Sequence, residues 1–512
     1  MRDEASAIYL PQMIEDYKSN PFIEALPPIM SAAQAVKALT VEPGYHESER
    51  EMDAFYRFHC VQRLFRYFQP LDTHIDIEQR VSRSIRQSYI NRNPVQAQYV
   101  QRLRQCGDAI QKQSFMDFQG VRSTAAGFTV IGMSGVGKTT SMAQVLSLYP
   151  QCITHTRYND EPFYVKQLVW LKLDCPYDGS LKGLCLSFFG EVDRLLGSEY
   201  SKIHAPSRNT VDSMLPKMTQ VASTHGLGLL VIDEIQHLSM AKSGGSEKML
   251  NFFVTLVNTI GVPVVLIGTT KAMPILQSEF RQARRGSGQG DLLWERMPND
   301  ISWEIMLRSM WRYQWTREKC ALSKAMSNAL YDESQGIIDI AVKLYAMAQI
   351  KAITEGTELV TVVAIKEVAC EKLRLVKPML DALRSGEMKK ILQFEDIRPI
   401  SVEDYLSVQT TRLPPEEMPS QPISSLEEQA VLKLLEMDIP SKAARQCVKK
   451  ALKGATTGQP LSKIVQKAFR LALMMDTAET AIESAADTND IRQAADYNNM
   501  KNTNVIADGT EW

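Results

Sequence analysis

The stretch Gly132-Met-Ser-Gly-Val-Gly-Lys-Thr139 decides the fold. It has the phosphate-loop pattern G-x-x-x-x-G-K-[ST], and it lies between the apolar run 128–131 and the helix-like segment 140–148. Glycines let backbone N–H groups wrap phosphates, and the dipole at the start of the following helix attracts them. We expect Lys138 to reach the β- and γ-phosphates of a nucleotide and Thr139 to hold Mg²⁺. The predicted nucleotide-binding residues are Gly132, Ser134, Gly135, Val136, Gly137, Lys138, Thr139 and Thr140.

A second apolar run, Gly228-Leu-Leu-Val-Ile-Asp-Glu234, ends in two carboxylates. A buried parallel strand reads as a continuous apolar run, and this one would present both acids at its C-terminal end. Nucleotide hydrolysis needs one carboxylate to anchor the hydrated metal and another to orient and deprotonate water. We therefore expect Asp233 to hold Mg²⁺ and Glu234 to be the general base, with ATP and Mg²⁺ as cofactors.

The composition is that of a globular protein with no global charge bias. The 512 residues allow two or three domains, and 58 basic against 59 acidic residues mean that any nucleic-acid surface must be local. The eight cysteines form no metal-ligand spacing and are interpreted as buried thiols of a reducing compartment. The sequence shows neither a signal peptide nor an uncharged run of about 18 residues, so we expect a cytoplasmic protein without a membrane partner.

Strand and helix patterns alternate from about residue 120, as a parallel three-layer domain requires. Strands are predicted at 167–174 and 262–267, and helices at 181–196, 211–224 and 246–260. Past the glycine-rich loop 286–290 the strand signal fades and helical periodicity dominates. The expected domains are a partner-docking arm (1–50), an N-terminal helical region (51–119), the nucleotide-binding core (120–299), a helical lid (300–395), a proline-rich linker (396–424), a small helical region with basic residues (425–475) and a disordered tail (476–512).

Two N-terminal features allow more than one interpretation. The apolar, proline-containing stretch Asn20–Pro28 is either a docking peptide for a partner or a segment that packs on its own domain. Arg80, Arg83 and Arg86 share one face of a predicted helix. That face either grips phosphates or is a solvated or subunit-facing surface.

Three further features distinguish the chain from a simple kinase or small GTPase. Thr269 follows the strand after the acidic one, where its hydroxyl can order the attacking water, and a helical lid follows the sheet. An arginine cluster shortly after that strand can reach the nucleotide of a neighbouring subunit. This is the layout of an AAA+ ATPase: an α/β P-loop domain with a parallel central sheet in three αβα layers, then an all-helical lid. The cluster consists of Arg281, Arg284 and Arg285.

The chain resembles the TnsC family, the AAA+ regulators of heteromeric transposons. The resemblance covers roughly residues 15–390. It implies an ATPase that forms a ring or helical homo-oligomer on double-stranded DNA and links a target-selector protein to the transposase subunits, without cutting DNA itself. The runs that carry it are Asn20–Pro28, Asp178-Gly-Ser-Leu-Lys-Gly-Leu-Cys-Leu, Leu229–Leu238, Gly261–Thr269 and Ala283-Arg-Arg-Gly286.

The resemblance also directs attention to the lid and to the DNA contacts. Many AAA+ proteins have a lid arginine in a Gly-x-x-Arg pattern, but after Gly336 the matching position here is Asp339, and Lys343 is the candidate substitute. DNA contacts in the family lie on strand-to-helix insertions facing the pore. Basic side chains and helix starts bind phosphates without reading bases. The candidate DNA-binding residues are Lys182, Lys202, Arg208 and Thr210.

Two other protein classes share this nucleotide-site pattern. A helicase loader or replication initiator has nearly the same site and differs in its partner, and a signalling NTPase of the STAND type would not bind DNA. For the transposition regulator, we expect the arm around Asn20–Pro28 to contact the target selector and the region beyond Pro414 to contact the transposase.

Overall fold

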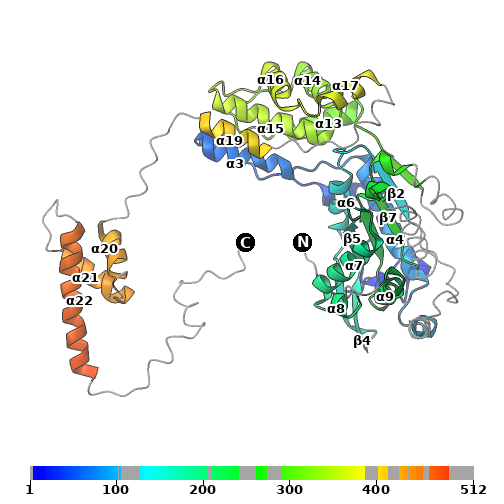
Figure 1. The fold of residues 1–512 in the computed structure, drawn as a ribbon, viewed down its shortest axis with the longest axis horizontal. Helices are drawn as coiled ribbons and strands as arrows, with labels where there is room; N and C mark the ends of the chain where they lie inside the picture. The colour runs from blue at the N-terminus through cyan, green and yellow to red at the C-terminus, as the bar shows by residue number, and fades with distance from the viewer. Residues whose placement is uncertain are drawn as a thin grey trace. The chain divides into compact units, whose positions relative to one another are not determined.

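The computed structural model describes residues 4–101, 103–104, 127–204, 210–240, 261–273, 276, 290–386, 402–412, 426–435, 437, 439–453 and 461–483. The chain divides into two compact units, Met1–Arg412 and Leu413–Trp512 (Figure 1). The first unit contains the phosphate loop, and each unit is described by itself.

A five-stranded parallel sheet forms the centre of the first unit, with strand order β5-β6-β7-β2-β8. Every residue of β2, β6 and β7 is buried, as the continuous apolar runs predict. The phosphate loop follows β2 and the two acids stand at the end of β6, so both lie at the carboxyl edge of the sheet. The strands are β2 Phe128–Gly132, β5 Trp170–Asp174, β6 Leu229–Asp233, β7 Val264–Gly268 and β8 Asp291–Trp294.

β8 was not predicted, because past the glycine-rich loop 286–290 the strand signal in the sequence fades; the structure nevertheless has a strand at Asp291–Trp294. β8 pairs in parallel with β2, and Thr129 donates a hydrogen bond to the Asp291 carboxylate at the start of the pair. The strand has only four residues, and its apolar run Leu292–Trp294 is too short to indicate a strand by itself. Gly132 sits so close to it that a Cβ there would lie 2.1 Å from the Trp294 carbonyl oxygen.

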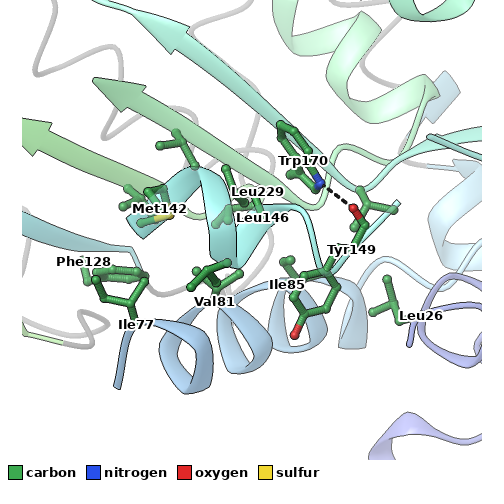
Figure 2. Packing of buried hydrophobic residues seen from close by; sticks show 14 of the residues in the cluster. Leu26, Ile77, Val81, Ile85, Phe128, Met142, Leu146, Tyr149, Trp170 and Leu229 are labelled. Carbon is green, nitrogen blue, oxygen red and sulfur yellow. Dashed lines mark hydrogen bonds between the residues drawn. The ribbon is translucent and has the colours of Figure 1, made fainter. Parts of the chain in front are cut away.

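Helices cover both faces of the sheet, which confirms the three-layer α/β fold. Along β6, Leu229 and Val231 belong to the apolar cluster on one face, and Leu230 and Ile232 to the cluster on the other. Figure 2 shows the first cluster, where Trp170 Nε1 donates to the Tyr149 carbonyl oxygen at 3.1 Å. The helices are α4 Asp72–Ile90 and α6 Lys138–Leu146 on that face, and α7 Leu181–Leu196 and α9 Val211–Thr224 on the other.

A second, three-stranded sheet precedes β5. It has the order β1-β3-β4, with β1 Glu4–Ser6, β3 Cys152–Tyr158 and β4 Glu161–Leu168. The predicted strand 167–174 is divided between two strands. Its first two residues are the end of β4, and Val169 separates them from β5. The Val169 N–H donates to the Gln151 carbonyl oxygen at 2.9 Å instead of joining the central sheet.

The segment Asn20–Pro28 packs on its own domain, which decides between the two interpretations of the sequence. It forms the short helix α1 Pro21–Glu24, in which Phe22 and Ile23 are fully buried against α4 and the sheet. Asn20 Nδ2 donates to the Tyr89 carbonyl oxygen at 2.8 Å. A partner cannot contact these apolar side chains without unfolding the segment, so the expectation of a docking peptide here is wrong.

The arginines predicted to share a helix face lie on α4, which is a layer of the core rather than a separate N-terminal region. Arg86 is buried and donates to Ser82 Oγ at 2.8 Å and to the Pro27 carbonyl oxygen. Arg80 Nε donates to Asp76 at 2.9 Å. Arg86 therefore fixes the N-terminal segment to α4 and offers nothing to an external phosphate.

The lid is helical, as expected, and it packs against N-terminal helices. α3 Ala54–Val61 and the 3₁₀ helix η3 Gln62–Arg66 contact α15, and Arg57 forms a two-bond ion pair with Glu358 at 2.6 and 2.7 Å. The expected linker 396–424 is wrong in part, because α19 Val402–Arg412 packs on α15 with Tyr405 fully buried. The lid helices are α13 Ile301–Trp311, α14 Lys324–Ser334, α15 Ile338–Thr354, α16 Val362–Lys372 and α17 Lys377–Ser385.

Short helices complete the described part of the first unit, and helices make up most of the described part of the second. The short elements are η1 Glu15–Tyr17, α2 Ala32–Leu39, η2 Glu47–Glu51, α8 Tyr200–His204, η5 Ile235–Met240 and η7 Thr270–Ala272. Within its described residues the second unit has α20 Leu426–Leu435, α21 Ser441–Leu452 and α22 Leu461–Glu483, and α22 extends past the expected limit at 475. Among the helices in the described ranges, none is long and apolar enough to cross a membrane.

Candidate nucleotide-binding site

A pocket at the carboxyl edge of the central sheet gathers residues from three strand ends and the lid. The phosphate loop, the end of β6, the end of β7 and the first turn of α15 all contribute. Among the predicted ATP-binding residues, Gly132 lies at the end of β2 and Val136 points into the core, so neither lines the pocket. The lining residues are Ser134, Gly135, Gly137, Lys138, Thr139, Thr140, Asp233, Glu234, Gln236, Gly268, Thr269 and Asp339.

The phosphate loop requires glycine at two positions. Gly135 has φ of 80° and Gly137 has φ of 100°, both in the left-handed region that side chains rarely adopt. Gly137 is also the residue before α6, so the helix starts directly at Lys138 and its free N–H groups face the pocket. Such a helix start attracts phosphate.

Lys138 folds back onto the loop that carries it. Its ammonium donates to the Gly132 carbonyl oxygen at 2.8 Å and to the Met133 carbonyl oxygen at 2.6 Å. Burial lowers the pKa of Lys138 to about 8, although the charges of Asp233 and Glu234 act in the opposite direction. When a nucleotide binds, its anionic phosphate oxygens would replace these neutral carbonyl oxygens as acceptors for the Lys138 ammonium. The negative charge would keep the lysine protonated.

Asp233 has a buried carboxylate oxygen suited to a cation. Its Oδ1 accepts the Glu234 backbone N–H at 2.8 Å, and Oδ2 has no hydrogen bond of good geometry within the described residues. Lys172 on β5 places its ammonium 3.1 Å from Oδ2 and 2.8 Å from Asp174. Burial alone would lower the pKa of Lys172, but the hydrogen bond to Asp174 and the charge of Asp233 raise it. The oxygen fits Mg²⁺, with the Thr139 hydroxyl in the same pocket.

Glu234 is held by a residue that the sequence analysis did not single out, Gln236. Glu234 has φ of 57°, which is uncommon for a residue with a side chain, and it is the first residue after β6. Gln236 Nε2 donates to Glu234 Oε2, and Gln236 Oε1 accepts the Thr269 backbone N–H at 3.0 Å. One buried amide therefore joins the end of β6 to the end of β7.

Thr269 and the lid helix complete the pocket. The Thr269 hydroxyl is buried and has no hydrogen-bond partner among the described residues, so it is available to a phosphate oxygen or a water. Asp339 lines the pocket from the first turn of α15, and Lys343 Nζ donates to it at 2.7 Å. The lid therefore presents a lysine–aspartate pair, with Asp339 rather than Lys343 at the pocket wall.

The predicted DNA-binding residues are not brought together. Lys182 lies in the first turn of α7, whereas Lys202 lies in α8 beyond the other end of that helix, roughly 20 Å away at the helical rise per residue. Lys202 is exposed and pairs with Glu199 at 2.5 Å. Thr210 precedes α9 without capping it through its side chain. Arg208 and the proposed trans arginines Arg281, Arg284 and Arg285 lie outside the described residues.

Comparison with known proteins identifies the central part of the chain. Residues 121–276, which hold the phosphate loop and the acidic strand, match the family model described as AAA domain. This part of the chain is an AAA domain. No curated protein sequence matches the chain.

Several solved structures match the chain at low identity and low TM-score. A Walker-type ATPase of Pyrococcus abyssi is 14% identical to this chain with a TM-score of 0.33. The match covers 62% of this chain and 85% of the ATPase. The Orc1 protein of Aeropyrum pernix, solved in complex with DNA, is 12% identical with a TM-score of 0.33 and coverages of 76% and 87%. A RuvB variant of Thermotoga maritima is 13% identical with a TM-score of 0.30 and coverages of 60% and 93%.

Replacement of Gln236 by alanine is expected to lower kcat for ATP hydrolysis about tenfold or more and to leave KM nearly unchanged. A hydrogen bond to a charged group is worth ~1.5–3 kcal/mol, and its loss frees the Glu234 carboxylate to turn away from the water. Steady-state phosphate release measures both constants, and Gln446→Ala, on an exposed position of α21, is the control. A rise in KM with an unchanged kcat would show that Gln236 serves nucleotide binding instead.

Proposed function

We propose that this protein is an ATP-dependent, DNA-binding regulator of DNA transposition, which links target-site selection to recruitment and activation of the transposase. The observation that carries the ATPase part is the pocket. It unites the phosphate-loop lysine, a buried carboxylate oxygen fit for Mg²⁺, a second carboxylate and an unsatisfied threonine hydroxyl. The resemblance of this chain to the TnsC family supports the assignment to transposition.

The residues of the pocket divide the work of hydrolysing ATP to ADP and phosphate. The Glu234 carboxylate accepts a proton from water as the water oxygen bonds to the γ-phosphorus and the bond to the β-phosphate oxygen breaks. Gln236 holds Oε2 and leaves Oε1 of Glu234 for that water. Thr139 and Asp233 would hold Mg²⁺, which neutralises phosphate charge when bound.

The described part of the pocket has one cationic side chain among its lining residues, Lys138. The transition state of phosphoryl transfer spreads negative charge over the γ-phosphate oxygens, and a further arginine accelerates it by about 10³ or more. We propose that Arg281, Arg284 or Arg285 of a neighbouring subunit supplies that charge. Activity then requires a homo-oligomer, either a ring or a helical filament.

The proposed partners are double-stranded DNA, the transposase subunits and a target-selector protein. We propose that Lys182, Lys202, Arg208 and Thr210 contact the DNA backbone in the assembled oligomer, where each subunit contributes the same residues. Lys182 and Lys202, roughly 20 Å apart, would contact separate phosphates of the backbone and would not read one base sequence.

The test combines assembly with partner capture. Light scattering is measured with ATP and duplex DNA, and immobilised protein is then offered purified transposase subunits of a heteromeric transposon. We expect an oligomer that forms with ATP and DNA together and that captures the transposase. Mixtures of Glu234→Gln subunits with subunits carrying Arg284→Ala and Arg285→Ala test whether the arginine acts in trans.

Failures of this test separate the alternatives. Capture of a replicative helicase instead of the transposase would assign the protein to helicase loading or replication initiation. Assembly that requires ATP and is unchanged by the addition of DNA would favour a STAND-type signalling NTPase. A protein that stays monomeric with both ligands would remove the oligomer model altogether.

A further inference from the structure

The charges of this chain are segregated along the sequence. The 37 residues from Ile439 to Met475 contain eight lysines and arginines and no acidic residue. The other 475 residues contain 50 basic and 59 acidic residues, so the rest of the chain is net negative. A near-zero total charge therefore hides one strongly cationic segment on an anionic protein.

All eight cations of this segment are exposed on α21 and α22. The two helices bury their apolar faces against each other and α20, with Ala444, Cys447 and Val448 of α21 in the shared core. The acidic residues of the same unit all lie outside this segment in the sequence: six precede it (Glu416, Glu417, Glu427, Glu428, Glu436 and Asp438), and the others follow from Asp476 onward. The cations are Lys442, Arg445, Lys449, Lys450, Lys453, Lys463, Lys467 and Arg470.

Four of these cations form a stripe along α21. Lys442, Arg445, Lys449 and Lys453 follow one another at intervals of three or four residues, which places them on one helix face. At the helical rise the stripe is roughly 16 Å long, which matches about five phosphates of one strand of duplex DNA. On α22, Lys463, Lys467 and Arg470 have the same spacing.

We infer that the exposed cationic surface of α21 and α22 binds the phosphate backbone of duplex DNA. This inference deepens the proposed function, on whose DNA partner it rests, and assigns to DNA the region that the sequence analysis gave to the transposase. The binding is independent of sequence, because lysine and arginine side chains contact phosphates without reading bases. The chemistry recognised is a regular array of anionic oxygens.

Charge complementarity favours DNA over an acidic protein surface as the occupant. Duplex DNA carries one negative charge per 1.7 Å, and a continuous cation stripe gains from releasing its condensed counterions. An acidic protein patch holds fewer and irregularly spaced charges. The anionic remainder of the chain also repels DNA at long range, so a concentrated cationic unit is needed to bring DNA to the ATPase.

The place of the unit in the chain gives this contact a role. The sequence that precedes it has four prolines between Leu413 and Pro422, the composition of a stiff tether. DNA bound on a tethered unit raises the local concentration of DNA at the ATPase of the same chain. The unit should therefore hold DNA whether or not nucleotide is bound, before any oligomer assembles.

The test uses the full-length chain and a fluorescent 30-base-pair duplex, followed by anisotropy without nucleotide and with ATP. The variant replaces Lys442, Arg445, Lys449 and Lys453 by glutamine, and the control replaces four exposed lid cations, Lys324, Lys366, Arg374 and Lys377. Without nucleotide, we expect the α21 variant to bind at least about tenfold more weakly and the salt slope of log K to shrink by about 3–4. The control should match the wild type, and circular dichroism should show both folded.

Each other outcome overturns the inference, and the proposed function is judged separately. Equal affinity of the α21 variant and the wild type would exclude this surface as the DNA site while leaving DNA binding by the ATPase unit intact. If the wild type binds DNA with ATP and not without nucleotide, this surface is likewise excluded as the DNA site. If the α21 variant keeps its DNA affinity and no longer captures the transposase, the surface binds an acidic protein and not DNA. No DNA binding in any condition would refute the proposed function as well.

Discussion

Glu234→Gln is expected to slow ATP hydrolysis at least about 100-fold, because a general base contributes about 10²–10⁴ to the rate. A glutamine cannot accept the proton from the attacking water. It retains the size of the side chain and an oxygen that can accept the hydrogen bond from Gln236 Nε2. The pocket should therefore keep its shape, and the affinity for ATP should change by less than about threefold.

Single-turnover phosphate release measures the chemical step, and calorimetric titration measures affinity. The control is Glu371→Gln, at an exposed position of α16 far from the strand ends in the sequence. The Glu234 variant should also stay assembled on DNA longer after ATP addition than the wild type does. A variant that turns over ATP at the wild-type rate would show that another group activates the water.

The site elements that sequence alone predicted are those whose chemistry fixes residue type and spacing. The phosphate loop needs glycine at Gly135 and Gly137, and both have left-handed backbones in the structure. The predicted helix 181–196 lies between Ser180 and Gly197, residue types that commonly begin and end helices. Ser180 caps it by accepting the Gly183 N–H, and Gly197 ends it at φ of 66°.

The elements that sequence missed depend on contacts between distant segments. β8 is a strand because β2 offers it a free edge, and its own four residues have no strand pattern. In the sequence alone, the apolar stretch containing Phe22 resembles a free docking peptide. In the structure it packs against Tyr89 of α4. Apolar periodicity shows that a residue is buried, but it does not show against which partner.

The same limit applies inside the site. Asp233 and Glu234 are adjacent to each other and stand at a recognisable strand end. Gln236 matters because folding brings the backbone N–H of Thr269, 33 residues later, to its side-chain oxygen Oε1. Lys172 reaches Asp233 because β5 and β6 are neighbours in register, Asp174 beside Asp233. No spacing in the linear sequence indicates either contact.

Lys138→Ala is expected to abolish measurable nucleotide binding, which corresponds to a loss of at least about 100-fold in affinity. The lysine is the single cation among the described pocket-lining residues, and charge-assisted hydrogen bonds to phosphate are about twice as strong as neutral ones. Isothermal titration with ATP and Mg²⁺ measures the loss. Lys366→Ala, at an exposed position of α16, is the control.

The depressed pKa of Lys138, about 8, adds a signature that simple misfolding cannot produce. Bound phosphates stabilise the protonated lysine, so its pKa is higher in the complex than in the free protein. Binding therefore takes up a proton at pH values between the two pKa values, and ATP affinity should be constant below about pH 8 and fall up to tenfold per pH unit above it. Titrations from pH 7 to pH 10 in buffers of different ionisation enthalpy would measure that uptake directly. An affinity that stays flat across this range, or a Lys138→Ala variant with wild-type affinity, would place the phosphates elsewhere.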